Sequence, residues 1–208
     1  IDTILSVGRT LYRNLTIWDG VSEEYSDAES LTVENAIIGS VGGATTNGDC
    51  RDMSGFTVVP GLIDAHVHMT LDPAIRTPEE QIAQPDDVIK VGMAKRAEDM
   101  VRAGITSARD LGGGKWLELE LRDRINVGEL IGPRLLCAGQ PITSVKGHCH
   151  FWGGEAADTT TAIKVIELQA EHGVDLIKIM ATGGMMTKGS SPREAQFDAL
   201  TMTAIVQA

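Results

Sequence analysis

The sequence predicts an α/β fold in which a small β region precedes four β/α units. Residues 1–57 show no helical periodicity, whereas short apolar runs alternate with helical patterns over residues 58–208. The chain is also rich in glycine, with 23 residues, and only 4% aromatic, which suits tight strand-to-helix turns. We therefore expect one β unit over 1–57 and a parallel sheet with outer helices over 58–208.

The first region contains three strand patterns. Residues 10–20 predict a strand closed by an Asp19-Gly20 turn. Residues 30–34 and 36–42 predict two more strands, and Glu34-Asn35 between them predicts the tight turn of a hairpin. Residues 55–60 then lead out of the region.

The second region alternates strands with helices. Strands are predicted over 63–68, 105–110, 134–139 and 174–180, and helices over 86–103, 116–127, 160–172 and from about Leu200. Glycines 104, 128 and 173 follow the first three helices, as helix C-termini favour. The apolar face of the first helix contains Val88, Ile89, Met93, Ala97, Met100 and Val101, and that of the third contains Ile163, Ile166 and Ala170.

Four β/α units predict the first half of a (β/α)8 TIM barrel, because the whole barrel takes about 250 residues. The alternative is an open, doubly wound sheet. Its dinucleotide-binding form is disfavoured, because no G-x-G-x-x-G motif follows the first predicted strand.

Charge and cysteine content restrict the partners of the chain. The net charge is −11 and no basic stripe is present, which argues against nucleic acid. No apolar run reaches the roughly 20 residues that cross a membrane. Cys50, Cys137 and Cys149 are far apart and form no C-x-x-C pair, which indicates free thiols and a cytoplasmic location.

His66 and His68 are the strongest functional signal. Residues i and i+2 of a strand face the same side, so the two imidazoles can bind one metal ion. They also end the first predicted barrel strand, where barrel enzymes place their sites. Two unrelated surface histidines are the weaker explanation, because the surrounding segment Val58–His68 is far more specific than a bare H-x-H.

The segment Val-Val-Pro-Gly-Leu-Ile-Asp-Ala-His-Val-His resembles the signature of the amidohydrolase superfamily. The resemblance implies that residues 1–57 are the N-terminal part of a composite β-sandwich, and that the chain is the N-terminal half of the protein. It also implies that His66 and His68 bind one or two divalent metal ions, most often zinc, whereas Asp64 serves as a hydrogen-bonding residue. The loop over 183–197 resembles the imidazolonepropionase-like and Xaa-Pro dipeptidase-like branch.

Lys178 lies in the apolar run 176–180, where an unpaired ammonium is costly to bury. Burial lowers the pKa of a lysine and so increases the fraction of neutral amine. The resemblance implies that this amine takes up carbon dioxide and that the resulting carbamate bridges two metal ions. The alternative is a lysine that extends from the strand end into solvent.

Three further residues are candidates for substrate binding. His148 and His150 form a second H-x-H after the third predicted strand, and similar proteins carry a substrate-facing loop there. A metal-binding or purely structural role for these histidines stays open. Arg193 could bind a substrate carboxylate bidentately or remain a solvated loop arginine. Arg109 and Asp110 end the second strand, either beside the site or in a salt bridge that orders the loop.

The resembled family has further histidines on strands five and six, and a strand-eight aspartate that serves as general acid/base. None of these can be assigned here, so no catalytic acid/base is assigned and the aspartate is expected beyond Ala208. We expect a metal-dependent hydrolase of C–N bonds in dipeptides, N-acyl amino acids or cyclic amides, inactive as this chain alone.

Two other functions stay open. One is a non-catalytic, metal-binding half barrel completed by another chain. The other is an open-sheet enzyme with a different cofactor, which stoichiometric metal at His66 and His68 would exclude. The full-length protein is expected to act on a small molecule or dipeptide and to form a homo-oligomer.

Overall fold

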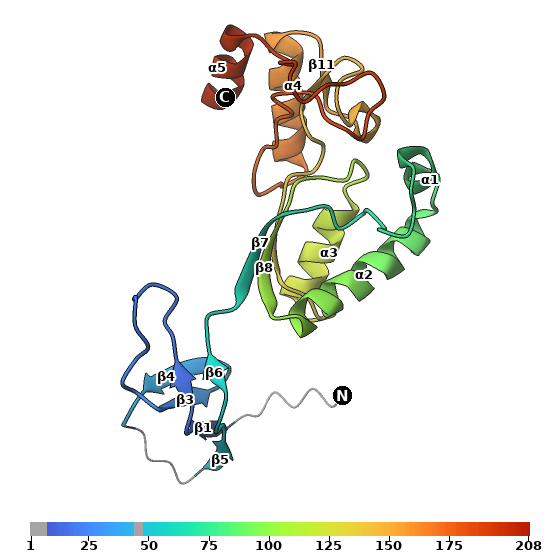
Figure 1. Ribbon diagram of the computed structural model, residues 1–208. Coiled ribbons are helices and arrows are strands. Elements are labelled where there is room, and N and C mark those ends of the chain that lie inside the picture. The colour runs from blue at the N-terminus through green and yellow to red at the C-terminus, as the bar shows by residue number, and fades with distance from the viewer. Residues whose placement is uncertain (1–7, 44–47) are drawn as a thin grey trace. The chain divides into compact units, whose positions relative to one another are not determined.

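The computed structural model describes residues 8–43 and 48–208. The chain divides into two units, Ile1–Gly61 and Leu62–Ala208 (Figure 1). The sequence placed this boundary after residue 57, and residues 1–7 and 44–47 of that predicted region lie outside the described residues.

The first unit is built from short strands. They are β1 (Arg9–Arg13), β2 (Thr16–Ile17), β3 (Ser30–Glu34), β4 (Ile37–Val41), β5 (Asp49–Asp52) and β6 (Thr57–Val58). One sheet has the order β4-β3-β1-β5, and β2 pairs with β6 in parallel. Strand β1 is antiparallel to β3 and parallel to β5. Leu15, Ile17 and Leu31 form the buried centre of this unit.

Local backbone geometry corrects two predictions in the first unit, and one further strand was not predicted. The single strand predicted over 10–20 is divided by Asn14, whose φ of 60° breaks the extended backbone. The hairpin turn lies at Asn35-Ala36 rather than Glu34-Asn35, because Glu34 pairs with Ile37. Both turn residues have positive φ, 51° and 63°, as a two-residue type I′ turn requires. Strand β5 was not predicted, because all four of its residues are exposed and lack an apolar pattern.

The Asp19-Gly20 turn is confirmed. One carboxylate oxygen of Asp19 accepts hydrogen bonds from the Val21 and Ser22 amides, both at 2.8 Å. Gly20 has a φ of +83°, which glycine adopts without strain.

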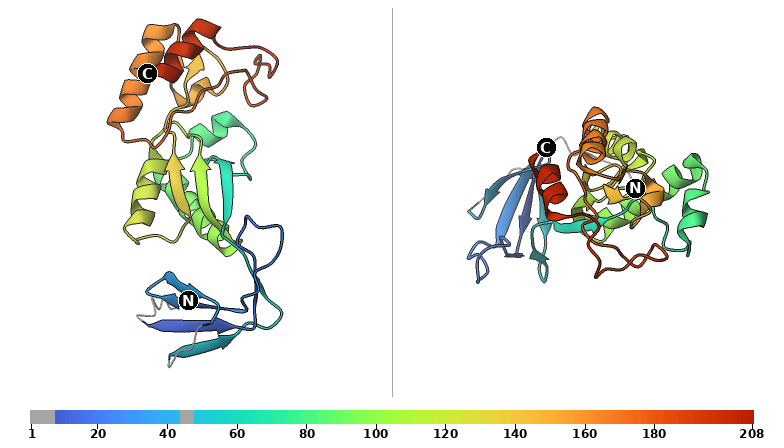
Figure 2. Two further views of the ribbon diagram at one scale, coloured as in Figure 1. Left: turned by 90° about the vertical axis from the view of Figure 1, so that its left-hand side faces the viewer. Right: turned by 90° about the horizontal axis from the view of Figure 1, so that it is seen from above.

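The second unit contains a parallel sheet of the order β7-β8-β9 (Figure 2, left). The strands are β7 (Leu62–Val67), β8 (Ile105–Asp110) and β9 (Arg134–Cys137). Helices α2 (Asp86–Arg102) and α3 (Leu117–Asn126) connect successive strands and pack beside the sheet (Figure 1). The alternating order predicted for this part of the chain is therefore confirmed.

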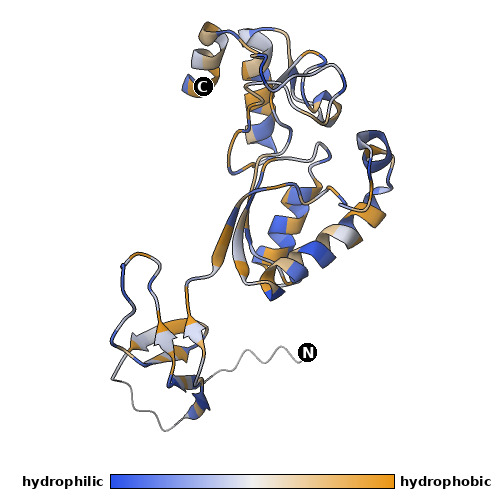
Figure 3. Ribbon diagram, viewed as in Figure 1, coloured by the Kyte–Doolittle hydropathy of each residue, from blue (hydrophilic) through white to orange (hydrophobic). Residues whose placement is uncertain are grey.

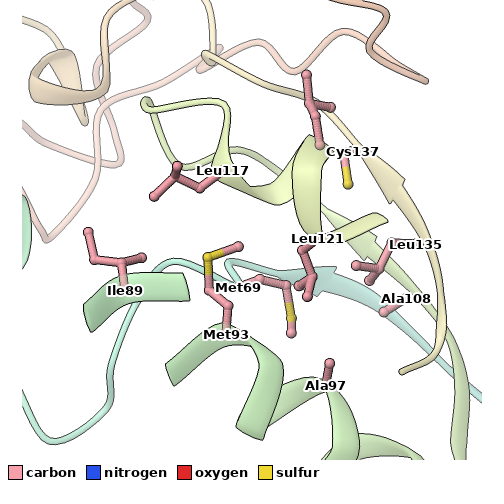
Figure 4. Packing of buried hydrophobic residues seen from close by; sticks show 10 residues of the cluster. Met69, Ile89, Met93, Ala97, Ala108, Leu117, Leu121, Leu135 and Cys137 are labelled. Atoms are coloured by element: carbon pink, nitrogen blue, oxygen red, sulfur yellow. The ribbon is translucent and has the colours of Figure 1, made fainter. Parts of the chain in front are cut away.

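The core of the second unit lies between these helices and the sheet (Figure 4). It contains Met69, Ile89, Met93, Ala97, Ala108, Leu117, Leu119, Leu121, Leu135 and Cys137. Both helices carry apolar and polar residues along their length (Figure 3). On α2, Ile89, Met93 and Ala97 are buried as predicted, whereas Val88 is exposed.

The strand predicted over 174–180 is not formed. Instead, Ile179 makes an isolated bridge with Ile142, with hydrogen bonds from the Ile142 amide to Lys178 O and from the Met180 amide to Ile142 O. The partner segment cannot offer a continuous ladder, because β9 ends at Cys137 and Pro141 has no amide proton.

A second buried cluster follows the sheet and contains Ile142, Ala156, Ala162 and Ile205. Ala156, Ala162 and Ile205 lie on β11 (Glu155–Ala156), α4 (Thr159–Glu171) and α5 (Ala199–Gln207), and Ile142 directly precedes β10 (Thr143–Ser144). The prediction of Ala170 on the buried face of α4 is wrong, because Gln169 is buried there and Ala170 is exposed. A register shifted by one residue turns that position about 100° around the helix.

Two short helical elements were not predicted, because each is shorter than the windows in which periodicity is visible. They are α1 (Pro78–Ile82) and the 3₁₀ turn η1 (His150–Trp152). Within the described ranges, no helix is long and apolar enough to cross a membrane.

Candidate metal centre

His66 and His68 lie together at the end of β7, with ring centroids 5.3 Å apart. The backbone of β7 near the two histidines differs from the regular strand, with side chains on alternating faces, that the sequence predicted. The pairing of β7 with β8 shifts between Asp64 and Val67, because Asp64 faces Ala108 while Val67 faces Asp110. One extra residue is thus accommodated in β7 as a bulge, a feature that redirects side chains near functional sites.

Asp64 supports this bulge, as its predicted hydrogen-bonding role implied. Its carboxylate accepts a hydrogen bond from the His66 amide at 3.1 Å.

The spacing of the two imidazoles matches that of two histidines on one metal ion. Two ring nitrogens at about 2.1 Å from a tetrahedral ion place the ring centroids about 5.2 Å apart. The observed separation is 5.3 Å. His68 Nδ1 lies 2.7 Å from Gly112 O, and because a carbonyl only accepts, Nδ1 carries the proton. Nε2 of His68 is therefore the nitrogen left for a metal.

The protonation of both histidines also suits a metal ligand. Burial lowers the pKa of His68 to about 4, and the positive charges of His66 and Lys178 contribute to the decrease. Burial lowers the pKa of His66 as well, followed by the charges of Lys178 and Arg109. His68 is therefore neutral near pH 7, and the lowered pKa of the more exposed His66 favours the neutral form, which is the form that coordinates a metal.

Lys178 is brought to the histidines from a distant part of the chain. Its charge lowers the pKa values of His66, His68 and His148, which places it within electrostatic reach of all three. Burial lowers the pKa of Lys178 itself, and the nearby Arg109 guanidinium lowers it further. The amine therefore loses its proton more readily than a solvated lysine.

His148 lies against the loop that follows Lys178. A side chain added at Gly184 would place its Cβ only 2.3 Å from His148 ring atoms, so the ring packs directly on this glycine. The His148 amide donates to Gln196 Oε1 at 2.6 Å, and Gln196 Nε2 donates to Met180 O at 2.6 Å. Gln196, which the sequence gave no reason to select, thus joins the His148 loop to the Lys178 segment.

His150 and Arg193 are not brought to this centre by any contact in the described residues. His150 begins η1, and its ring packs edge-on against Phe151 at 5.9 Å. Arg193 is exposed, and its backbone amide donates to Ser191 Oγ at 3.3 Å. Their substrate-binding roles remain predictions.

Protein ligands beyond the histidine pair are limited. Over residues 8–43 and 48–208, no group of three or more His, Cys, Asp or Glu side chains is arranged to hold a metal ion. The role of Lys178 as a carbamate ligand therefore stays a prediction.

Three neighbours of the histidines carry weaker sequence signals or none. The Trp152 ring lies 4.8 Å from the His68 ring. The side chains of Arg109 and Asp110 form hydrogen bonds with the backbone around the histidine pair. Within the described residues, they do not form the salt bridge that the sequence left open. Their position at a strand end was the available signal, and it could not separate the two roles.

Comparison with known proteins decides the family. A model of the Amidohydrolase family matches residues 57–208. The chain belongs to the amidohydrolase family. Within this family, it is 26% identical over 176 residues to the ochratoxinase of Aspergillus niger. The aligned region covers 72% of this chain and 36% of that relative.

Solved amidohydrolase structures share this architecture. A Xaa-Pro dipeptidase with methionine bound in its active site matches with a TM-score of 0.80 and 26% identity, over 96% of this chain and 53% of that one. The A. niger ochratoxinase structure matches with a TM-score of 0.75 and 23% identity, over 96% and 52% of the respective chains. The chain thus spans about half the length of these structures.

Proposed function

We propose that this chain is part of a metal-dependent hydrolase that cleaves C–N bonds in dipeptides or N-acyl amino acids. The observation that carries the proposal is the pair of imidazoles, 5.3 Å apart, on which the charge of Lys178 acts. The similarity to a Xaa-Pro dipeptidase supports the choice of substrate class.

His66 and His68 would hold a divalent ion, for which zinc is best suited because it favours imidazole nitrogen. Lys178 would be the carbamate ligand. Its neutral amine forms an N–C bond to carbon dioxide and releases a proton, leaving an anion with two oxygen donors. The lowered pKa of Lys178 favours this reaction by increasing the neutral fraction. When bound, the metal polarises the scissile carbonyl and makes a water molecule more acidic.

His148 is the best supported of the proposed substrate-binding residues, because Lys178 lies within its electrostatic reach. Its ring packs on Gly184, so its position depends on the loop that follows Lys178. A substrate at the metal centre would therefore meet this imidazole.

A complete active site would also need groups from protein outside these 208 residues. The further ligands and the general acid/base would come from there, and Leu62–Ala208 would form the first half of a (β/α)8 barrel. The coverage of about half of the solved relatives supports this assignment. The isolated chain would accordingly have negligible turnover.

Metal content and dipeptide hydrolysis test the proposal together. The purified protein is expected to contain zinc, and His66→Ala/His68→Ala is expected to lose most of it. In the full-length protein, Lys178→Ala should lose hydrolysis of Xaa-Pro dipeptides and the response to added bicarbonate, whereas Lys164→Ala, at an exposed position on α4, should retain both. Wild-type protein that folds but binds no metal would contradict the proposal.

A further inference from the structure

Asp110, the last residue of β8, is a buried carboxylate with two short hydrogen bonds to the backbone. Its side chain is fully buried, with 0% exposure. Oδ2 accepts from the Met69 amide at 2.7 Å, and Oδ1 accepts from the Gly112 amide at 2.7 Å. One carboxylate therefore holds the segments that follow two neighbouring strands.

Both backbone positions belong to the immediate surroundings of His68. Met69 follows His68 in the chain, and Gly112 O accepts the hydrogen bond from His68 Nδ1 at 2.7 Å. Asp110 thus fixes the main chain of the histidine and the carbonyl that orients its ring. Such outer contacts set the tautomer and direction of a metal-binding imidazole.

The sheet alone cannot provide this restraint. Strand β7 ends at Val67, so His68 lies beyond its last ladder residue. The bulge also disturbs the pairing between Asp64 and Val67, a stretch that includes His66, and there Arg109 Nε donates to Ala65 O at 2.8 Å. Side chains from the end of β8 therefore hold the β7 backbone on both sides of the histidine pair.

Asp110 is charged at neutral pH despite its burial. Burial raises its pKa to about 6, while the Met69 and Gly112 amides lower it. Glu118 lies within electrostatic reach, and the pKa of this second buried acid is raised to about 8, mainly by burial. One carboxylate is thus available as a strong acceptor while its neighbour remains neutral.

We infer that Asp110 is a positioning residue that holds His68 as the Nδ1–H tautomer, with Nε2 directed to the metal. The inference rests on the proposed function for the presence of the metal. The tautomer of His68 is independent of metal and can be measured without it.

The test compares Asp110→Asn with Glu118→Gln. Asparagine nearly preserves the shape of Asp110 but has one accepting oxygen for the two amides. Glutamine replaces a carboxyl group that is also buried but has no hydrogen bond to the β7 loop among the described residues. ¹⁵N NMR of histidine-labelled, metal-free protein reports the His68 tautomer, and Co²⁺ titration reports metal affinity.

The Nδ1–H form is expected in the wild type and in Glu118→Gln. Asp110→Asn should populate the other tautomer and bind Co²⁺ about 10–100-fold more weakly. If Asp110→Asn does not fold, Asp110→Ser, whose hydroxyl can accept one of the two bonds, is measured in its place.

Three results would overturn the inference: an Nε2–H tautomer in the wild type, an unchanged tautomer in the Asp110 variant, or equal losses in the Asp110 and Glu118 variants. Failure of the proposed function has a different signature, in which the wild type shows the Nδ1–H tautomer but binds no Co²⁺.

Discussion

Glu118→Gln is expected to change how the stability of the protein depends on pH. Glu118 lies in the first turn of α3 with 0% exposure. Neither of its carboxyl oxygens has a hydrogen-bond partner in the described residues. Burial, followed by the charge of Asp110, raises its pKa from 4.5 to about 8. The folded protein therefore holds Glu118 protonated at neutral pH.

The size of the pH-dependent contribution of Glu118 to the free energy of unfolding follows from the difference between its pKa values in the folded and unfolded states. Below pH 4.5 both states are protonated and Glu118 makes no pH-dependent contribution. Between pH 4.5 and about 8 the unfolded chain loses the proton that the folded protein keeps, so stability falls as pH rises. Each pH unit costs about 1.4 kcal/mol, which sets a ceiling of about 5 kcal/mol over the full interval.

Glutamine does not titrate, so the variant escapes this loss. Urea unfolding at pH 5 and pH 8, followed by the fluorescence of Trp116 and Trp152, measures both proteins. The free energy of unfolding of Glu118→Gln, relative to wild type, should rise by about 2–4 kcal/mol between these pH values. The control, Glu167→Gln, replaces an exposed glutamate of α4 and should show no such rise. A pH-independent difference for Glu118→Gln would refute the reasoning.

Three substitutions, two of them paired with a control substitution, test the fold. Gly112→Ala should cost about 2–4 kcal/mol in urea unfolding. Its φ is +105° and the new Cβ would lie 2.5 Å from a backbone oxygen. The control, Gly104→Ala, has a φ of +88° but open space around the new Cβ, and should cost about 1 kcal/mol. Equal losses of stability in the two glycine variants would show that the clash at Gly112 has no effect. Met93→Ala should cost about 2–5 kcal/mol because Met93 is 1% exposed, and Val91→Ala, at 72% exposed, less than about 0.5 kcal/mol. Asp158→Ala should remove the N-terminal cap of α4 and cost about 1 kcal/mol, so an unchanged melting temperature would argue against the cap.

Local patterns predicted much of the second unit. Strand β8 has the predicted bounds, and α2 ends one residue before its predicted end, because periodic apolar residues and a following glycine mark such elements directly. The run 174–180 has an equally strong apolar pattern but forms no strand. A strand also requires a partner with available backbone groups, and Pro141 interrupts that partner. No property of residues 174–180 themselves reveals this interruption.

For the candidate site too, some properties follow from the sequence and others only from the folded structure. The residue types alone show which groups are available: two imidazoles near one strand end, and a lysine in an apolar run. That Nε2 rather than Nδ1 of His68 is available follows only from the folded protein, because Nδ1 donates to Gly112 O and the amide of the same glycine donates to Asp110. Burial and the charge of Lys178, which lower the histidine pKa values, likewise come from distant segments. Residue identity determines the donors, whereas protonation and direction depend on neighbours that only folding brings together.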